Sequence, residues 1–222
     1  MFVISGIVPV ARPAGRFELM VDGKPFAVLS FDAIEQLGLA IGRPIAGLEE
    51  QIAREVARLK VHDRALNMLA FRARSSAELA RSLVRKGELK EHVEWAIGRL
   101  LELGLLDDAA FAQAFTRAKV LGAKQSRRRV QQDLSRKGVA RSVSDEAIDR
   151  VFDEEGVDQR EIVEEAARKK LRSLRGLEPP VRRRRLYAFL ARRGYDADDI
   201  RSAMEAVGSA PVAGDEEESG EE

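Results

Sequence analysis

Apolar residues recur with helical spacing through most of the chain, and three stretches share one pattern. The stretches are 75–87, 126–138 and 181–194. In each, a leucine lies four residues before a glycine and another aliphatic residue lies eight before it, so both fall on one helical face. Two basic residues precede each glycine, which can take the left-handed conformation that ends a helix. The pattern predicts three short amphipathic helices with the same ending.

A second apolar pair with four-residue spacing follows each glycine. The pairs are Val93 and Ile97, Ile148 and Phe152, and Ile200 and Met204. The middle pair begins ten residues past its glycine and the other two begin six residues past theirs, which predicts a four-residue insertion within 139–143. The glycines are 51 and 56 residues apart. A helical unit of this length cannot bury its apolar face alone, so we expect neighbouring units to stack.

The predicted fold class is mainly α, with three tandem three-helix modules in an elongated array after a small β segment. The predicted domains are an N-terminal β-hairpin extension with a connecting helix (1–60), module 1 (61–107), module 2 (108–156), module 3 (157–208) and an acidic disordered tail (209–222). The helices are expected near 61–73, 76–86 and 89–103 in module 1, near 108–121, 126–137 and 143–154 in module 2, and near 158–174, 180–193 and 197–207 in module 3.

The first 44 residues have a different pattern, which favours strands. Phe17 to Val21 and Phe26 to Leu29 flank the Asp22-Gly23 pair, a strong tight-turn signal, so we expect a β-hairpin. An earlier β-prone run, 3–8, offers a third strand. Ser30 is placed to cap a short helix that Gly38 ends. So small a sheet needs a helix to pack on, and the segment after it offers one.

Composition narrows the setting of the protein. Aromatic residues make up 5% and charged residues 34%, which suits solvated helices better than a thick sheet core. The chain has no cysteine, so neither disulfides nor thiolate metal sites can stabilise it. No apolar run approaches the length that spans a bilayer, and no secretory signal is evident. We expect a cytoplasmic protein without a membrane partner.

The formal net charge of +1 conceals two basic segments. Residues 116–138 hold eight basic residues and one acidic residue, and residues 160–194 hold twelve and four. The last eight residues contribute six negative charges. Basic helical segments indicate an anionic partner more than the net charge does.

No catalytic constellation is present in the sequence. His62 and His92 lack the nearby ligands of a metal site, and we expect both to be structural. A phosphate loop with its lysine, a GxGxxG after a strand and a GxSxG elbow are all missing. We therefore predict no enzymatic activity, no cofactor and no metal.

The basic residues of modules 2 and 3 are the candidate site, because they repeat at matching offsets from their glycines. Arg129 and Arg136 lie seven residues apart, as do Arg185 and Arg192, so each pair lines one side of its helix. The candidate contact residues are Arg127, Arg128, Arg129, Arg136, Lys137, Arg183, Arg184, Arg185, Arg192 and Arg193. Two interpretations stay open: a solvated face with ion pairs to acids within 153–165, or a surface for DNA phosphates or an acidic protein.

One junction resembles a known family. The motif is Leu105-Leu106-Asp107-Asp108, followed by Phe111, Ala112 and Phe115. It lies between the RKG at 85–87 and the RKG at 136–138, and the RRG at 192–194 comes later. Together these features resemble the bacterial RecX regulatory proteins. The resemblance covers about 65–207, and the N-terminal segment is similar to an extension that some members carry. The insertion and the acidic tail depart from the family pattern.

The resemblance implies a non-enzymatic modulator of the RecA recombinase. Family members bind RecA and its nucleoprotein filament and inhibit strand exchange, ATP hydrolysis and the coprotease function. On this basis the expected partners are RecA and the RecA–DNA filament, with weak binding to single- or double-stranded DNA. The expected processes are recombination, DNA repair and the SOS response. We also expect the protein to be a monomer. The alternative is a direct DNA-binding protein with tandem helix-turn-helix-like modules.

Overall fold

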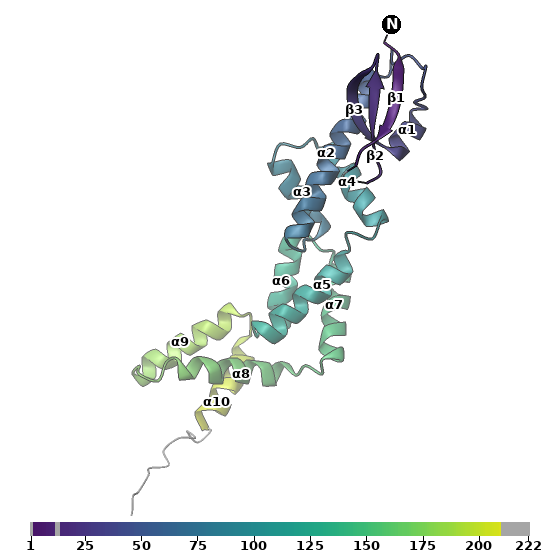
Figure 1. Cartoon of the computed structure of the whole chain (residues 1–222). Coiled ribbons are helices and arrows are strands. Elements are labelled where there is room, and N and C mark those ends of the chain that lie inside the picture. The colour runs from purple at the N-terminus through teal and green to yellow at the C-terminus, as the bar shows by residue number, and fades with distance from the viewer. Residues whose placement is uncertain (1, 12–13, 210–222) are drawn as a thin grey trace, which may run out of the picture. The chain divides into compact units, whose positions relative to one another are not determined.

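The computed structural model describes residues 2–11 and 14–209, in which a small sheet precedes a series of helices (Figure 1). The chain divides into two compact units, 1–107 and 108–222. Unit 1 contains β1 (Ile4–Pro9), β2 (Arg16–Val21), β3 (Lys24–Ser30), α1 (Phe31–Gln36), α2 (Glu49–Phe71), α3 (Ser76–Arg85) and α4 (Lys90–Glu102). Unit 2 contains α5 (Asp108–Arg117), a short π-helical segment η1 (Ala118–Gly122), α6 (Arg127–Lys137), α7 (Arg141–Glu154), α8 (Gln159–Arg172), α9 (Pro179–Arg192) and α10 (Ala197–Ser209). The mainly α fold class with an N-terminal sheet is confirmed.

The predicted hairpin is present and belongs to a three-stranded antiparallel sheet in the order β1-β2-β3. Asp22 and Gly23 have φ values of 48° and 73°, as a tight hairpin turn requires. The inner face of the sheet contributes Ile4, Leu19, Val21 and Leu29 to a buried core. Helices α1 and α2 pack against the sheet (Figure 1). Ser30 caps α1, because its Oγ accepts a hydrogen bond from the Ala33 backbone N–H at 3.2 Å.

Helix α2 contributes residues to two hydrophobic cores of unit 1. Its first half adds Ile52 to the core under the sheet, and its second half adds Val61 and Ala65 to the helical core with α3 and α4. The predicted connecting helix and the first helix of module 1 are therefore one continuous helix. The domain boundary placed at residue 60 falls inside it.

The three helices with a shared ending are confirmed. The three leucines placed four residues before each glycine, Leu83, Leu134 and Leu190, are fully buried. The closing glycines have φ values of 90°, 82° and 88° at Gly87, Gly138 and Gly194. The N-caps of α3 and α6 are also alike in geometry, because Ser75 and Ser126 each accept a hydrogen bond from the backbone N–H three residues later.

The predicted four-residue insertion in module 2 is wrong. Helix α7 begins three residues after Gly138, and α4 and α10 begin three residues after their own glycines. The position six residues past the glycine is buried in all three modules, and in module 2 it is Ser144, with no exposed surface. A buried polar residue therefore interrupts the apolar pattern, while the length of the connection is unchanged.

Candidate partner-binding surface

Three of the four arginines of α6 are paired with acidic side chains inside unit 2. Arg127 forms an ion pair with Asp149 of α7, and its guanidinium carbon lies 4.7 Å from the centre of the Phe152 ring. Asp133 accepts from Arg129 at 3.2 Å and contacts Arg136 at 3.5 Å. Much of the charge that the sequence places on α6 is therefore balanced locally.

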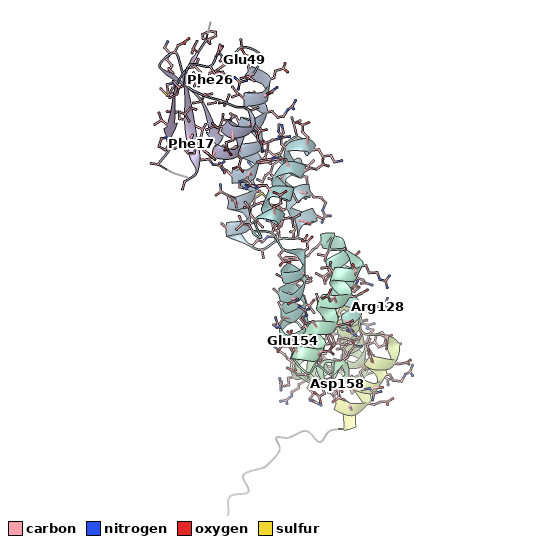
Figure 2. The ribbon with its side chains drawn as sticks, turned by 90° about the vertical axis from the view of Figure 1, so that its right-hand side faces the viewer. Phe17, Phe26, Glu49, Arg128, Glu154 and Asp158 are labelled. Atoms are coloured by element: carbon pink, nitrogen blue, oxygen red, sulfur yellow. The ribbon has the colours of Figure 1, made fainter. Side chains whose placement is uncertain are left out.

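The other candidates on α6 differ in their surroundings. Arg128 is exposed (Figure 2). The Lys137 ammonium lies 5.3 Å from the Phe115 ring centre and 5.7 Å from that of Phe111, so it covers the aromatic pair on α5. Arg136 lines a cavity of about 450 Å³ between α6 and the start of α7.

Modules 2 and 3 are joined by three hydrogen bonds between two loops, one from a backbone N–H and two from side chains. The Ser126 N–H donates to the Arg193 carbonyl at 3.0 Å. The Arg193 Nε donates to the Ala123 carbonyl at 2.9 Å, and the Tyr195 hydroxyl donates to the Lys124 carbonyl at 2.9 Å. These bonds join residues about 70 positions apart in the sequence, so a short-range sequence pattern does not predict them.

Arg193 is therefore a structural residue, and its place among the candidate contact residues is not supported by its surroundings. Its guanidinium lies 3.9 Å from the centre of the Phe189 ring. Burial lowers the pKa of Arg193 from its usual range. A guanidinium that bonds a carbonyl oxygen and lies against a ring keeps its charge, but it has fewer N–H groups left to bind a partner.

Helix α9 offers a different environment from α6. Its exposed arginines are Arg183, Arg184, Arg185 and Arg192, which are spread over about half of the helix circumference and which we call together the α9 basic face. Within residues 2–11 and 14–209, none of the four forms an ion pair. The interpretation of the basic residues as ion-paired solvation thus fits α6, whereas it does not account for α9.

The N-cap Glu178 is the one acidic residue at the start of α9. The first turn of the helix has no acidic residue, and Glu178 makes no side-chain capping hydrogen bond. Arg183, Arg184 and Arg185 are consecutive cations just past the first turn, so they repel one another. A bound anion would remove this repulsion, so the α9 basic face is suited to an anionic partner.

Three acidic residues within 153–165 pair with cations that are not among the ten candidate contact residues. Arg117 of α5 contacts Glu154 at 2.9 Å and Glu155 at 2.6 Å. Lys124 contacts Glu165 at 2.6 Å. These acids therefore stabilise contacts within unit 2 and leave the α9 basic face unneutralised.

Both histidines are buried parts of the helical core of unit 1. His62 packs edge-on against Trp95 with ring centres 6.2 Å apart, and its two nitrogens have no hydrogen-bond partner in the described part of the chain. Burial lowers the pKa of His62, and the nearby charge of Arg16 adds to the effect. Among the described residues, no group of three or more His, Asp or Glu side chains could hold a metal ion.

The fold defines a tandem helical-repeat protein, and three family models match its repeats. RecX, first three-helix domain, matches residues 62–100; RecX, second three-helix domain, matches 107–148; and RecX, third three-helix domain, matches 158–204. No helix in the described residues is long and apolar enough to cross a membrane.

Curated relatives and solved structures carry the same family name. Regulatory protein RecX of Chlorobaculum tepidum is 38% identical over 145 residues, 65% of this chain and 86% of that protein. Regulatory protein RecX of Pelodictyon phaeoclathratiforme is 34% identical, over 69% of this chain and 91% of that protein. A crystal structure of regulatory protein RecX, 23% identical, shares the fold with a TM-score of 0.74 and covers 95% of this chain and 100% of its own. The chain belongs to the RecX family.

Proposed function

We propose that this protein regulates the RecA recombinase by binding RecA and its nucleoprotein filament. Membership of a family of regulatory proteins supports the regulatory role. The α9 basic face, whose four arginines have no ion-pair partner in the described part of the chain, is the observation that supports an anionic binding partner. An acidic RecA surface or the phosphates of filament DNA would supply the missing negative charge.

The proposed effect on RecA is inhibition of ATP hydrolysis, strand exchange and coprotease activity. A repeat protein can inhibit without chemistry of its own, because binding one state of a filament shifts its population by mass action. Tandem modules that each make a weak contact gain affinity from being linked. On this proposal the protein acts as a binding regulator in the cytoplasm and needs no cofactor.

The test is DNA-dependent ATP hydrolysis by purified RecA while this protein is titrated from substoichiometric amounts, with its binding to free DNA measured in parallel. We expect inhibition at concentrations well below those that coat the DNA. If hydrolysis fell only as the protein saturated the DNA, direct competition for DNA would explain the effect and filament regulation would be refuted.

A charge-matched pair of variants tests the α9 basic face. The triple change of Arg183, Arg184 and Arg185 to Gln should raise the concentration needed for half-inhibition by about tenfold or more, since each lost charge-assisted contact weakens binding. The control is the triple change of Arg141, Arg150 and Arg168 to Gln. Those exposed arginines pair with acids one turn away on their own helices, so their loss should change inhibition little.

Direct DNA binding through the tandem modules is a second candidate function. The unpaired arginines of α9 favour it as well, because phosphate contacts of this kind need no specific base sequence. It predicts binding to DNA without RecA and a steep loss of affinity with salt that becomes shallower in the α9 triple variant. In the RecA assay, equal inhibition of ATP hydrolysis by the α9 triple variant and the control triple variant would mean that the partner contact lies outside α9.

A further inference from the structure

Tyr187 is the one large apolar side chain that is exposed in the described part of unit 2. It is 47% exposed, and the other exposed large apolar residues of the described chain, from Phe2 to Leu105, lie in unit 1. The remaining aromatic rings of unit 2 are buried or half-buried. A single exposed ring is common on protein surfaces, so its meaning depends on the side chains beside it.

The ring lies beside the charges of the α9 basic face. Arg183 and Arg184 precede Tyr187 by four and three residues, which places all three on one side of the helix. Ala191, exposed one turn later on that side, is too small to cover the ring. Phe189 of the same helix is covered, with Arg193 at 3.9 Å and Lys170 at 5.5 Å from its centre.

Tyr187 is not needed for the core of α9. The buried side of the helix is formed by Leu186 and Leu190. The positions seven residues before the closing glycine in modules 1 and 2 hold Ala80 and Gln131, so the shared module fold does not require an aromatic ring here. Removing the Tyr187 ring should therefore leave the fold intact.

The chemistry beside Tyr187 combines an open aromatic ring with cations that lack acidic partners. Single-stranded nucleic acid presents the complementary pair, since each nucleotide carries a planar base whose face is accessible and a phosphate. In a duplex the base faces are stacked inside, and an acidic protein surface offers carboxylates without regularly spaced planar rings. The combination thus favours a single strand over the other two anionic partners.

We propose that Tyr187 is a base-stacking residue of a single-stranded nucleic-acid site on α9, with Arg183 and Arg184 contacting the phosphates. The proposal rests on the proposed function in one respect, namely that the α9 basic face is a contact surface. It narrows the anionic partner of Arg183 and Arg184 to a single strand and names the residue that selects it. Tyr187 selects single strands through stacking, and the arginines supply affinity that depends on salt.

The experiment uses the purified full chain without RecA and a fluorescently labelled oligothymidylate, with binding followed by anisotropy at several salt concentrations. Tyr187→Ala should weaken binding by about tenfold or more, because stacking of one base is lost, and should leave the salt slope unchanged. Tyr187→Phe should retain the wild-type affinity. Arg184→Gln should instead make the slope shallower by about 0.7, the value for one phosphate contact on a single strand.

Two controls separate stacking from other effects. Phe26→Ala removes a ring on β3 that is 46% exposed, close to the value for Tyr187, and should not change binding (Figure 2). A duplex of the same length should lose no affinity with Tyr187→Ala. Thermal melting of each variant should match that of the wild type.

The proposal is overturned if the wild type does not bind the oligothymidylate at low salt, or if Tyr187→Ala binds it as the wild type does. It is also overturned if the duplex loses as much affinity as the single strand. Loss of RecA inhibition in Tyr187→Ala with unchanged oligothymidylate binding would identify the ring as a protein contact, which refutes this site and retains the regulator. Absence of RecA inhibition by the wild type would refute the regulator, while the anisotropy still decides the role of Tyr187.

Discussion

Gly194 meets two separate conformational requirements. Its φ of 88° lies in the left-handed region, which side chains with a Cβ rarely adopt. A Cβ at this position would also lie 2.5 Å from the Arg129 Cβ and 2.7 Å from the Ser126 Oγ. The glycine therefore both ends α9 and lets the start of α6 approach its end.

Gly194→Ala should lower the free energy of unfolding of unit 2 by about 2–4 kcal/mol, the sum of a left-handed alanine and an overpacked contact. The measurement is the chemical-denaturation midpoint followed by circular dichroism. Gly156→Ala is the matched control, because Gly156 has a φ of 58° with nothing within 4 Å of an added Cβ, and should cost only about 1 kcal/mol. Equal losses in the two variants would show that the close approach does not contribute.

Single residues show where sequence reasoning succeeds and where it stops. The left-handed glycines were predictable, because the preceding helix pattern is local. The pairing of the arginines was not, since Asp149 lies 22 residues from Arg127 and the Ala123 carbonyl lies 70 residues from Arg193. Ten basic residues with similar local patterns thus separate into paired, buried and unpaired groups only in the folded chain.

Helix α7 illustrates the limit of periodicity at the scale of an element. Ser144 occupies the position that Val93 and Ile200 hold in the other modules, so a search for apolar residues passes over it and shifts the register by one turn. The Ser144 Oγ donates to the Ala140 carbonyl at 2.9 Å, and the Ser144 N–H donates to the same oxygen at 2.9 Å. A hydroxyl that bonds within its own helix can be buried without another partner.

Ser144→Ala should raise the free energy of unfolding by about 0.5 kcal/mol. Alanine has the higher helix propensity, keeps the Cβ and leaves the Ala140 carbonyl bonded to the backbone N–H. The shift in the denaturation midpoint measures the effect. A clear loss of stability would mean that the hydroxyl makes a contact beyond its own helix, and the assignment of Ser144 as an apolar position occupied by a polar residue would then fail.

At the scale of the molecule, the three modules do not each have a hydrophobic core of their own. A single hydrophobic cluster runs from Ala112 of α5 to Ala203 of α10, so modules 2 and 3 share one core. Modules 2 and 3 also differ in the segment before their middle helices. In module 2 this segment is 123–126, a loop that contacts module 3. The residues at the same offsets from the closing glycine of module 3 are 179–182, which form the first turn of α9.

The shared core predicts how fragments of unit 2 behave. A fragment of residues 108–209 should fold alone as a monomer and unfold in one cooperative transition, because it retains the whole cluster and the bonds of Ser126, Arg193 and Tyr195. A fragment of 108–156 should lack a cooperative transition, since it exposes the apolar surface that module 3 covers. Thermal melting by circular dichroism, with sedimentation to assign the mass, measures both. If the shorter fragment melted cooperatively near the midpoint of the longer one, module 2 would be an independent folding unit, and the contacts at Gly194 would position module 3 without stabilising module 2.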